Sequence, residues 1–577
     1  MQKALLEKAK GSRNWIEDWW YDAYTEIRSP LAPTTSIASI NPCSPASSDP
    51  RAQLLRAADC AHHLMGVWER IRKEENPITR SRGCVWDMYQ YHVLFNSNRT
   101  PAIPRDRMDR YFKTESDGPC PSHIIVLCRG TIWKCEMIRD GRLRTPDEMH
   151  RILSHIQKVS PHVSHSPITL TTEDRDTWAK VRDELRSVND GNRTNVQLIE
   201  ESAFVLTLSD EAVADEAELL RYSMLGRSDD AWQDKCQNAI VMADAQFTMQ
   251  ADHSNLDAIV VLDAGNQIGE RVRKEMWTPQ PTSDAYLPER LHFELTSSLL
   301  QHINRAEKNF QKRKSTVRAK VVRFRGYGND RLRKLKIYTD TVIQIALQLS
   351  FARVHGRFGP IYETASTRKF FHGRTETVRG LTHEMKTFGE ATLQNRPISE
   401  QLPLFKAAYD KHNHLMADAT EGKGKCQPKL PMPAIYKDVA WTKSGGDGNF
   451  DLSTSFIGYK EGGSYGYVCA MKEGGYGTFY GVFPKGFDLT ITDFTNTSSD
   501  LDGRLGAAAT AASTAVSITG SLNSYLPEGY RATVADAAEP HSTDALSADA
   551  ALAAAPLADA IAPDAAPAEA APEPSAE

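Results

Sequence analysis

Hydrophobic residues in this chain follow two spacings, which predict different elements. Short apolar runs at residues 124–128 and 131–135 are separated by Arg129-Gly130, and they predict two strands joined by a turn. Similar runs at 203–208 and 245–250 predict two further strands, the second of which leads directly into His253. Three late runs, at 466–470, 478–482 and 487–492, predict a second group of strands.

Two other segments carry a helical period. Between residues 341 and 353, apolar side chains recur on one face every 3.6 residues, which predicts a buried helix; they are Val342, Ile345, Ala346 and Leu349. Residues 15–21 form an aromatic helix face, more typical of a core than of a ligand site. Two mixed blocks, each ending in strands, predict a two-domain α/β architecture with His253 near the junction.

Composition narrows the class of protein. The chain has 577 residues, of which 40% are hydrophobic, and it has no apolar run of about 18 residues, so no membrane span is predicted. The first eight residues mix both charge signs and lack the apolar core of a signal peptide, so a soluble, intracellular protein is expected. Nine cysteines without a Cys-x-x-Cys pair argue against a disulfide framework and against a structural zinc site.

Charge is unevenly distributed along the chain. Residues 531–577 contain one arginine and nine acidic residues, a balance of −8, which leaves +3 for the rest of a chain whose net charge is −5. The body is therefore nearly neutral, and no nucleic-acid partner is predicted. The segment 531–577 is rich in Ala, Pro, Asp and Glu and has no aromatic residue, which predicts a disordered tail. It is either a dispensable extension or a tether.

His253 is the first candidate for chemistry. It follows a predicted strand, and Asp257 comes one helical turn later. An imidazole exchanges a proton near neutral pH, as the deprotonation of an alcohol requires. The pattern is common, so the two residues alone leave an ordinary structural pair open.

Three more segments bear on function, each with a plain alternative. Residues 361–379 alternate aromatic, hydroxyl and cationic side chains, and they form either a pocket wall or a solvated loop. Ser453-Thr454-Ser455 places three hydroxyls at a strand start, which suits an oxyanion site or an ordinary strand. Residues 327–336 carry four cations in six residues, which suits phosphate binding or a solvated loop.

In this order the segments resemble the choline/carnitine O-acyltransferase family, most nearly its carnitine palmitoyltransferase branch. The resemblance runs from about Trp15 to Leu522. It is carried by the string Tyr-Glu-x-Ala-Ser-x-x-Arg-x-Phe-x-x-Gly-Arg-Thr-Glu-Thr-Val-Arg from Tyr362 onward, and by segments 345–349, 404–415, 453–455 and 475–477.

The resemblance implies a two-domain, coenzyme A-dependent fold in which each domain is similar to chloramphenicol acetyltransferase. An interdomain tunnel admits coenzyme A from one side and carnitine from the other. We expect a helical segment at 1–30 packed on the C-terminal domain, an N-terminal domain at 31–293, a C-terminal domain at 294–530 and the tail. Acyl-CoA and carnitine are the expected partners of a monomer with no permanently bound cofactor and no metal.

The resemblance also assigns residues. His253 would be the general base, with Asp257 paired to Arg374 and an oxyanion bound by Ser455 and Ser453. The carnitine site would contain Tyr362, Thr375, Thr377 and Gln427, and the coenzyme A site Arg333, Lys336 and Asp340. Gly463 would be the acyl-chain gate, and a glycine there implies medium or long chains.

Some positions depart from the family. The arginine that pairs with the carnitine carboxylate is replaced by Gln427, so Lys423, Lys425 or Lys429 would have to supply the charge. Asn329 replaces a lysine that binds coenzyme A, and Phe456 replaces a glutamine. Choline or another amino alcohol is therefore an alternative acceptor, and an inactive acyl-CoA-binding homologue is a second alternative. Cytoplasm, peroxisome and mitochondrion all stay open as compartments.

Overall fold

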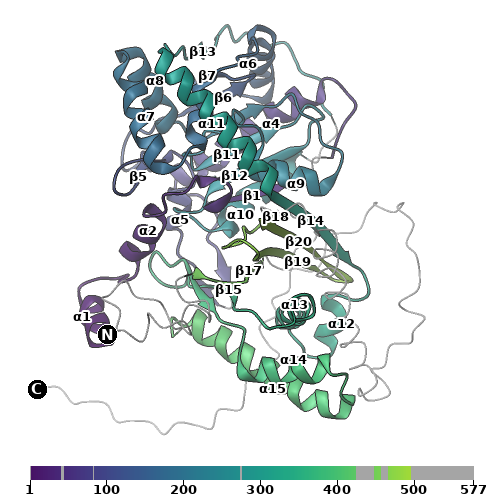
Figure 1. Ribbon diagram of the computed structural model, residues 1–577. Helices are drawn as coiled ribbons and strands as arrows, with labels where there is room; N and C mark the ends of the chain where they lie inside the picture. Colours follow the sequence, from purple (N-terminus) through teal and green to yellow (C-terminus); the bar gives the residue numbers. More distant parts are fainter. Residues whose placement is uncertain are drawn as a thin grey trace, which may run out of the picture.

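The computed structural model describes residues 2–40, 45–81, 83–272, 276–423, 448–456 and 465–494. Its architecture rests on two mixed sheets, one formed mainly by the first half of the chain and one by the second (Figure 1). The predicted residues Gln427 and Gly463 and the acidic tail lie outside the described residues.

Within the described residues, the first sheet has eight strands in the order β13-β7-β6-β10-β11-β12-β1-β18. Its centre is parallel between β6, β10 and β11, and the remaining pairings are antiparallel. The strands are β1 (Ser36–Ile40), β6 (His123–Cys128), β7 (Thr131–Glu136), β10 (Val205–Leu208), β11 (Gln237–Val241), β12 (Phe247–Asp252), β13 (Glu289–Arg290) and β18 (Tyr465–Tyr467).

Helices cover both faces of this sheet, which explains why its central strands are apolar on both sides. One begins at a reciprocal cap between the Thr145 hydroxyl and Glu148, with Pro146 at its first position. The helices are α4 (Ala52–Arg72), α6 (Pro146–Val159), α7 (Arg175–Ser187), α8 (Asp190–Glu201), α9 (Glu216–Leu225), α10 (Ala258–Val272), α11 (Ser297–Thr316) and the 3-10 turn η1 (Pro167–Thr172).

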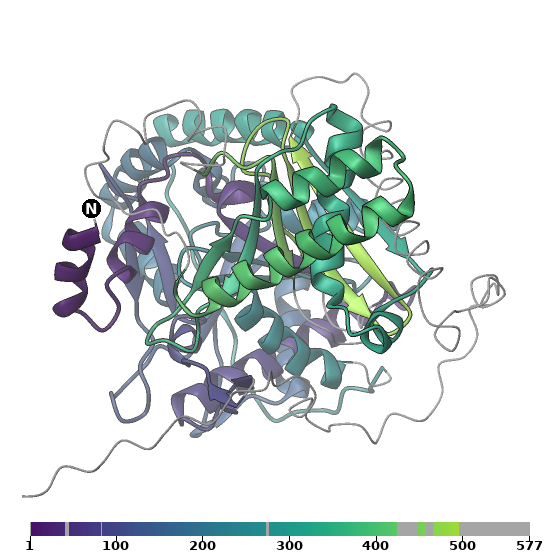
Figure 2. The same cartoon turned by 90° about the horizontal axis from the view of Figure 1, so that it is seen from below.

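The second sheet, as far as the structure describes it, has six strands in the order β14-β20-β19-β17-β15-β16. Helices α13, α14 and α15 cover one of its faces, as the view from below shows (Figure 2). The elements are β14 (Val317–Phe324), β15 (Ile361–Ser366), β16 (Thr375–Val378), β17 (Leu452–Phe456), β19 (Tyr476–Phe483), β20 (Gly486–Phe494), α12 (Asn329–Lys334), α13 (Thr339–His355), α14 (His383–Leu393) and α15 (Ile398–Thr420).

Alternation along β15 and β17 gives the second sheet two distinct faces. Ile361, Glu363 and Ala365 are buried, whereas the residues between them are partly exposed. Because β15 and β17 are parallel with Tyr362 opposite Ser453, Tyr362 and Ser453 lie on one face and Glu363 and Thr454 on the other. We name the first the interdomain face and the second the α13 face.

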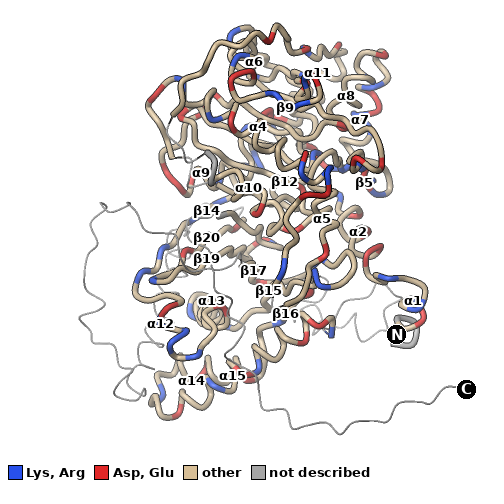
Figure 3. Tube along the Cα trace, turned by 180° about the vertical axis from the view of Figure 1, so that it is seen from behind, with Lys and Arg blue, Asp and Glu red and all other residues tan. Residues whose placement is uncertain are grey.

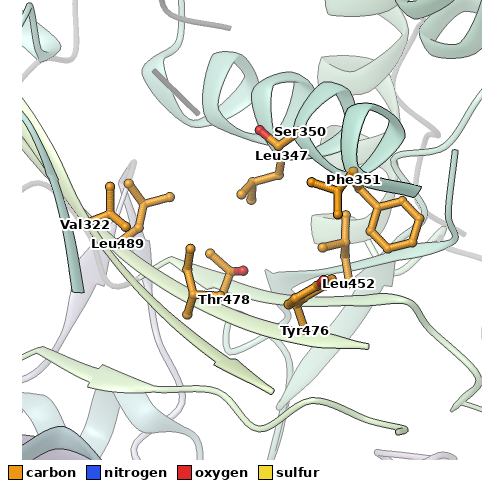
Figure 4. Close-up of a pocket in the computed structure, with 10 residues that line it drawn as sticks. Val322, Leu347, Ser350, Phe351, Leu452, Tyr476, Thr478 and Leu489 are labelled. Atoms are coloured by element: carbon orange, nitrogen blue, oxygen red, sulfur yellow. The ribbon is translucent and has the colours of Figure 1, made fainter. Parts of the chain in front are cut away.

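A small cavity remains between α13 and the second sheet (Figure 4). Its wall is apolar apart from hydroxyl groups, and it belongs to the core of the α13 face. It is lined by Val322, Leu347, Ser350, Phe351, Val354, Leu452, Tyr476, Thr478, Leu489 and Ile491. This cavity therefore lies on the opposite side of the sheet from Ser453.

The start of the chain connects the two halves. The Arg28 guanidinium donates to Asp106 and Asp176 of the first half, whereas Asn14 Nδ2 donates to the carbonyls of Phe371 and His372 in the second. The helices here are α1 (Gln2–Lys10), α2 (Glu17–Thr25), α3 (Leu31–Thr34) and, later, α5 (Tyr89–His92). Three short hairpins complete the structure: β2 (Arg80–Ser81) with β3 (Cys84–Val85), β4 (Ser97–Thr100) with β5 (Arg107–Arg110), and β8 (Ile138–Arg139) with β9 (Arg142–Leu143).

The predicted elements are confirmed where the sequence has a clear period. The strands predicted at 124–128 and 131–135 are β6 and β7, and those at 478–482 and 487–492 are β19 and β20. The helix predicted at 341–353 is α13, which is buried along most of its length. The run at 466–470 overlaps β18 only at residues 466 and 467, and this strand joins the first sheet through β1 and is not part of the second.

Candidate active site

His253 lies immediately after β12, between the two sheets. Its backbone N–H donates to the Thr35 carbonyl at 2.9 Å, which fixes the chain at the strand exit. Its side chain is 31% exposed, so the ring is accessible in a largely buried setting.

The tautomer of His253 follows from one hydrogen bond. Nδ1 is 2.7 Å from the Leu256 carbonyl oxygen, which accepts but cannot donate, so Nδ1 carries the proton. Nε2 is therefore the basic atom of the neutral ring. Burial lowers the pKa of His253 below its ordinary value, against the opposing effect of Asp257, and this keeps the imidazole neutral at pH 7.

Asp257 is held by two donors. Arg374 Nε donates to Oδ1 at 3.1 Å, and Gln90 Nε2 donates to Oδ2 at 2.9 Å. Oδ1 lies 3.9 Å from His253 Nδ1, too far for a hydrogen bond. The carboxylate therefore acts on the ring through space and does not take the ring proton.

Arg374 holds the backbone of the histidine loop as well. Its Nη1 donates to the Ser254 carbonyl at 2.8 Å and its Nη2 to the His253 carbonyl at 2.7 Å. The guanidinium is 8% exposed and lies over the Trp20 ring. One arginine of the second half thus fixes three groups of the first.

Hydroxyl groups gather on the interdomain face of the second sheet. Ser453 is 1% exposed, and its Oγ has no hydrogen-bond partner among the described residues. Ser455 is two residues further on the same face and is partly exposed. Below them, Thr454 Oγ1 donates to the Tyr362 carbonyl at 2.8 Å, which ties β17 to β15.

Tyr362 and the threonines of β16 lie on this same face. Thr377 pairs with Thr364, and Thr375 pairs with Ser366. Burial raises the pKa of Tyr362, while the hydroxyls of Thr375 and Thr364 act in the opposite direction. The Tyr362 ring packs edge-on against Phe450, with centroids 5.6 Å apart. Tyr362 and Thr375 are thus neighbouring polar side chains on this face, next to the Phe450 ring.

The sequence analysis did not identify two residues of this site. The Tyr24 ring of α2 lies 5.6 Å from the His253 ring, and burial raises its pKa. Gln90 of α5 binds Asp257. The aromatic helix face at 15–21 was a signal for α2, although that pattern predicted core packing. Nothing in the sequence around Gln90 indicates its contact.

The three residues predicted for coenzyme A lie together in sequence but differ in setting. Arg333, in the last turn of α12, and Lys336, just after this helix, are exposed in a segment where Lys and Arg gather (Figure 3). Asp340 is the second residue of α13 and accepts a hydrogen bond from Tyr480 on the α13 face. Burial, together with Glu363, raises the pKa of Asp340 to about 7.

A second small cavity lies between the two sheets. It is lined by residues of β1, β12 and α10 from the first half, and by residues of β18 and β19 from the second: Ile37, Ala38, Ser39, Met249, Ala258, Val261, Leu262, Gly466, Tyr467 and Phe479. Phe479 is paired with Ser455 in the sheet register. The apolar wall therefore adjoins the strand that carries the hydroxyls.

Comparison with known proteins decides the family. The model of the choline/carnitine O-acyltransferase family matches residues 1–505. The chain belongs to this family. It is accordingly an O-acyltransferase, and the prediction of a two-domain α/β acyltransferase fold is confirmed by the two sheets and by this membership.

Relatives of several acyl-chain classes match most of the chain. Peroxisomal carnitine O-octanoyltransferase of Mus musculus is 35% identical, over 84% of this chain and 82% of the relative. Mitochondrial carnitine O-palmitoyltransferase 2 of Homo sapiens is 26% identical, over 85% and 81%. Carnitine O-acetyltransferase of Mus musculus is 25% identical, over 86% and 82%.

Solved structures give weaker matches. The first condensation domain of the CDA synthetase has a TM-score of 0.36 at 8% identity, covering 86% of this chain and 94% of that one. The wax ester synthase/diacylglycerol acyltransferase from Marinobacter aquaeolei VT8 has a TM-score of 0.31 at 10% identity, covering 88% and 99%. Scores this low add nothing to the fold described above.

None of the helices in the described part of the chain has both the length and the apolar character needed to cross a bilayer. Within that same part, His, Cys, Asp and Glu form no group of three suited to hold a metal ion.

Proposed function

We propose that this family member reversibly transfers a medium or long acyl group between coenzyme A and the hydroxyl of carnitine, with His253 as the general base. The observation that carries the proposal is the tautomer of His253. With its proton on Nδ1 and bound to the Leu256 carbonyl, the ring presents a basic Nε2. The names of the carnitine-using relatives support carnitine as the acceptor.

The mechanism needs no covalent intermediate on the protein. His253 Nε2 takes the proton of the carnitine hydroxyl, and the oxygen attacks the thioester carbonyl. When the carbon–sulfur bond breaks, the imidazolium returns the proton to the leaving thiolate. Both substrates are held in one site, so proximity supplies much of the acceleration. Ser455, with Ser453 beside it, donates to the oxyanion that forms on the carbonyl. The buried, unpartnered Oγ of Ser453 supports a ligand oxygen at that position.

The acceptor pocket is assigned to the interdomain face. Tyr362, Thr375 and Thr377 would surround carnitine there, with Gln427 completing the pocket. Because Gln427 is neutral, the charge for the carnitine carboxylate would come from a lysine such as Lys423, Lys425 or Lys429. Arg333 and Lys336 would bind phosphates of coenzyme A, and Asp340 would contact its pantetheine arm.

A medium or long acyl chain is supported by the glycine at position 463, where the family resemblance puts the acyl-chain gate, and by the names of the octanoyl- and palmitoyltransferase relatives. The small cavity between the sheets has an almost entirely apolar wall and adjoins Ser455 through Phe479. It has room for about one water molecule, so a longer acyl chain would have to widen it.

The test uses thiol release from acyl-CoAs of two to sixteen carbons with L-carnitine. We expect turnover to be greatest at eight carbons or more, and H253Q to lower kcat by about 10²–10⁴. His62→Gln is the matched control, because the Nδ1 of His62 also lies 2.8 Å from a backbone carbonyl oxygen, that of Arg144, outside the site. Full activity in H253Q would refute the base assignment.

Neutral Gln427 favours one second candidate, in which choline or another amino alcohol is the acceptor. Running choline against carnitine in the same assay separates the two. If kcat/KM is higher for choline, the acceptor assignment is wrong. Binding of acyl-CoA by calorimetry without any thiol release would indicate instead an inactive homologue.

A further inference from the structure

Gln90 is buried where the two halves of the molecule meet. The structure assigns it as a positioning residue for the base, because it binds the oxygen of Asp257 that Arg374 leaves open and so keeps this carboxylate away from the His253 ring. The inference rests on the proposed role of His253 but concerns a residue that the reaction itself does not use.

The side chain of Gln90 is fully engaged. It is 2% exposed. Its Oε1 accepts from the Asp257 backbone N–H at 2.7 Å, while its Nε2 donates to Asp257 Oδ2 at 2.9 Å and to the Gly373 carbonyl at 3.2 Å. The acceptor and both donor hydrogens are therefore used, and only one orientation of the amide satisfies all three contacts.

These contacts decide where the proton on His253 Nδ1 goes. Nδ1 has two acceptors nearby: the Leu256 carbonyl at 2.7 Å and Asp257 Oδ1 at 3.9 Å. The Leu256 carbonyl accepts the hydrogen bond from Nδ1–H, because Arg374 and Gln90 hold the Asp257 carboxylate too far from Nδ1 to accept it. A carboxylate freed from Gln90 would compete for Nδ1–H, turn the ring and raise the pKa of His253.

Gln90 of α5 and the nearby Asp87 both bind the hairpin that carries Arg374. The backbone N–H of Asp87 donates to the Arg368 carbonyl at 2.6 Å, and Asp87 Oδ2 accepts from the His372 N–H at 3.0 Å. A Cβ at Gly373 would lie 1.9 Å from the Thr367 carbonyl oxygen, so only glycine fits there. Gln90 thus bonds to Asp257 and to Gly373, the residue before Arg374, and so connects the two chain segments that form the Asp257–Arg374 pair.

The experiment compares Q90L, Q90E and a matched control, Q53L, in the full-length protein. Gln53 is also buried, at 6% exposure, and also makes three side-chain hydrogen bonds: to the Ser209 and Val241 carbonyls and from Gln157. It lies near the end of β11, where Val241 pairs with Phe247 at the other end of β12 from His253. Q90E keeps the shape of glutamine, so it tests the contact even if Q90L folds poorly.

We expect kcat of Q90L to fall about 10- to 100-fold, with KM for both substrates within two-fold of wild type, since a small displacement of a reacting group has this effect. The acidic limb of the kcat profile should move to higher pH, because the base must be deprotonated and a freed carboxylate raises its pKa. Q90E, with a second carboxylate, should move it further. The other charged or titratable groups near the ring, Arg374, Asp252 and Tyr24, are unchanged in both variants.

A second readout needs no turnover. Diethylpyrocarbonate reacts with neutral imidazole, so the rate of His253 modification against pH, followed by mass spectrometry of its peptide, gives the titration midpoint of the ring. This midpoint should rise in Q90L and Q90E and stay at the wild-type value in Q53L. An unchanged midpoint in both Gln90 variants overturns the inference, whatever happens to activity. A shifted midpoint in a protein that releases no thiol would instead refute the proposed function and leave the positioning role intact.

Discussion

Buried ionisable groups have different surroundings at the two faces of the second sheet. At the interdomain face, each oxygen of Asp257 has its own donor, and burial lowers the pKa of His253. On the α13 face, Asp340 and Glu363 lie close together, and Glu363 Oε2 is 3.0 Å from His412 Nε2. There the pKa of Asp340 is raised to about 7. Burial alone would lower the pKa of His412, but Glu363 and Asp340 together raise it above its ordinary value.

The comparison separates two uses of buried ionisable groups. Near the base, charges are compensated by fixed partners, so that the imidazole alone is left to change its protonation state. Under α13, the Asp340 carboxyl and the His412 imidazole both have a raised pKa, and both lie close to Glu363. We therefore expect the pH dependence of activity to come from the interdomain face and that of stability to come in part from the α13 face.

The largest effect is expected from removing the Asp257 carboxylate, which compensates the buried positive charge of Arg374. In Asp257→Ala the Arg374 guanidinium keeps its burial but loses its carboxylate, so the free energy of unfolding should fall by about 3–5 kcal/mol. Urea denaturation measures it. Asp410→Ala removes the carboxylate of an exposed pair with Lys406 and should change the value by less than about 0.5 kcal/mol. Equal losses in the two variants would show that Arg374 is not dependent on Asp257.

The next effect concerns the hydroxyls on the same face. Ser455→Ala should lower kcat about 10²-fold without affecting stability, since it removes one donor to the oxyanion. Initial rates at saturating substrates measure it. Ser350→Ala is the control, because the Ser350 hydroxyl donates only to the Ala346 carbonyl within α13. A loss of stability in place of kcat would assign Ser455 to the fold.

A smaller effect tests the α13 face. A carboxyl group whose pKa is higher in the folded state binds more protons there, so it stabilises the fold at low pH, and this contribution is lost as pH rises from about 4 through 7. His412, with a raised pKa, acts in the same direction. In Asp340→Asn the thermal midpoint should therefore fall less between about pH 6 and about pH 8.5 than in wild type. Parallel curves for the two proteins would contradict this.

The smallest effect is expected at the exposed cations. Replacing Arg333 and Lys336 with alanine should raise KM for acyl-CoA by roughly five-fold, corresponding to about 1 kcal/mol, and leave kcat unchanged. The difference should shrink at high salt, because exposed charges are screened. A double variant at Lys406 and Lys411 of α15 controls for net charge. A kcat effect would place the two cations nearer the reacting atoms.

Local patterns in the sequence predicted the fold well, and distant contacts explain what they missed. The spacing of Val342, Ile345, Ala346 and Leu349 predicted α13, although this helix is buried on all sides from Thr341 to Ala352. In contrast, β1 was not predicted. All five of its residues are buried, and its two serines stand three positions apart, so they do not alternate with the apolar residues and give no period of two.

The candidate site shows the same division. His253 and Arg374 were found because they stand in recognisable strings of residues. Gln90 meets Asp257 across 167 residues of chain, and its neighbours Tyr89 and Tyr91 give no sign of a polar contact. Tyr24 lies in an aromatic helix whose pattern predicts core packing equally well. Such roles depend on which elements meet in space, and the sequence alone does not encode that in a local pattern.

Because β18 comes from the second half of the chain, the first sheet is incomplete without that half. This strand, from residues 465–467, covers the outer edge of β1. A Cβ at position 466 would lie only 2.3 Å from the Ala38 carbonyl oxygen, so this close pairing requires Gly466. Thr490 of β20 also donates to the Gly466 carbonyl at 2.6 Å. A fragment ending near residue 293 would expose the unpaired backbone hydrogen-bonding groups of β1, and exposed strand edges of this kind promote aggregation. The first sheet is therefore completed by a strand from the second half of the chain, and expression of residues 1–293 alone should give insoluble protein.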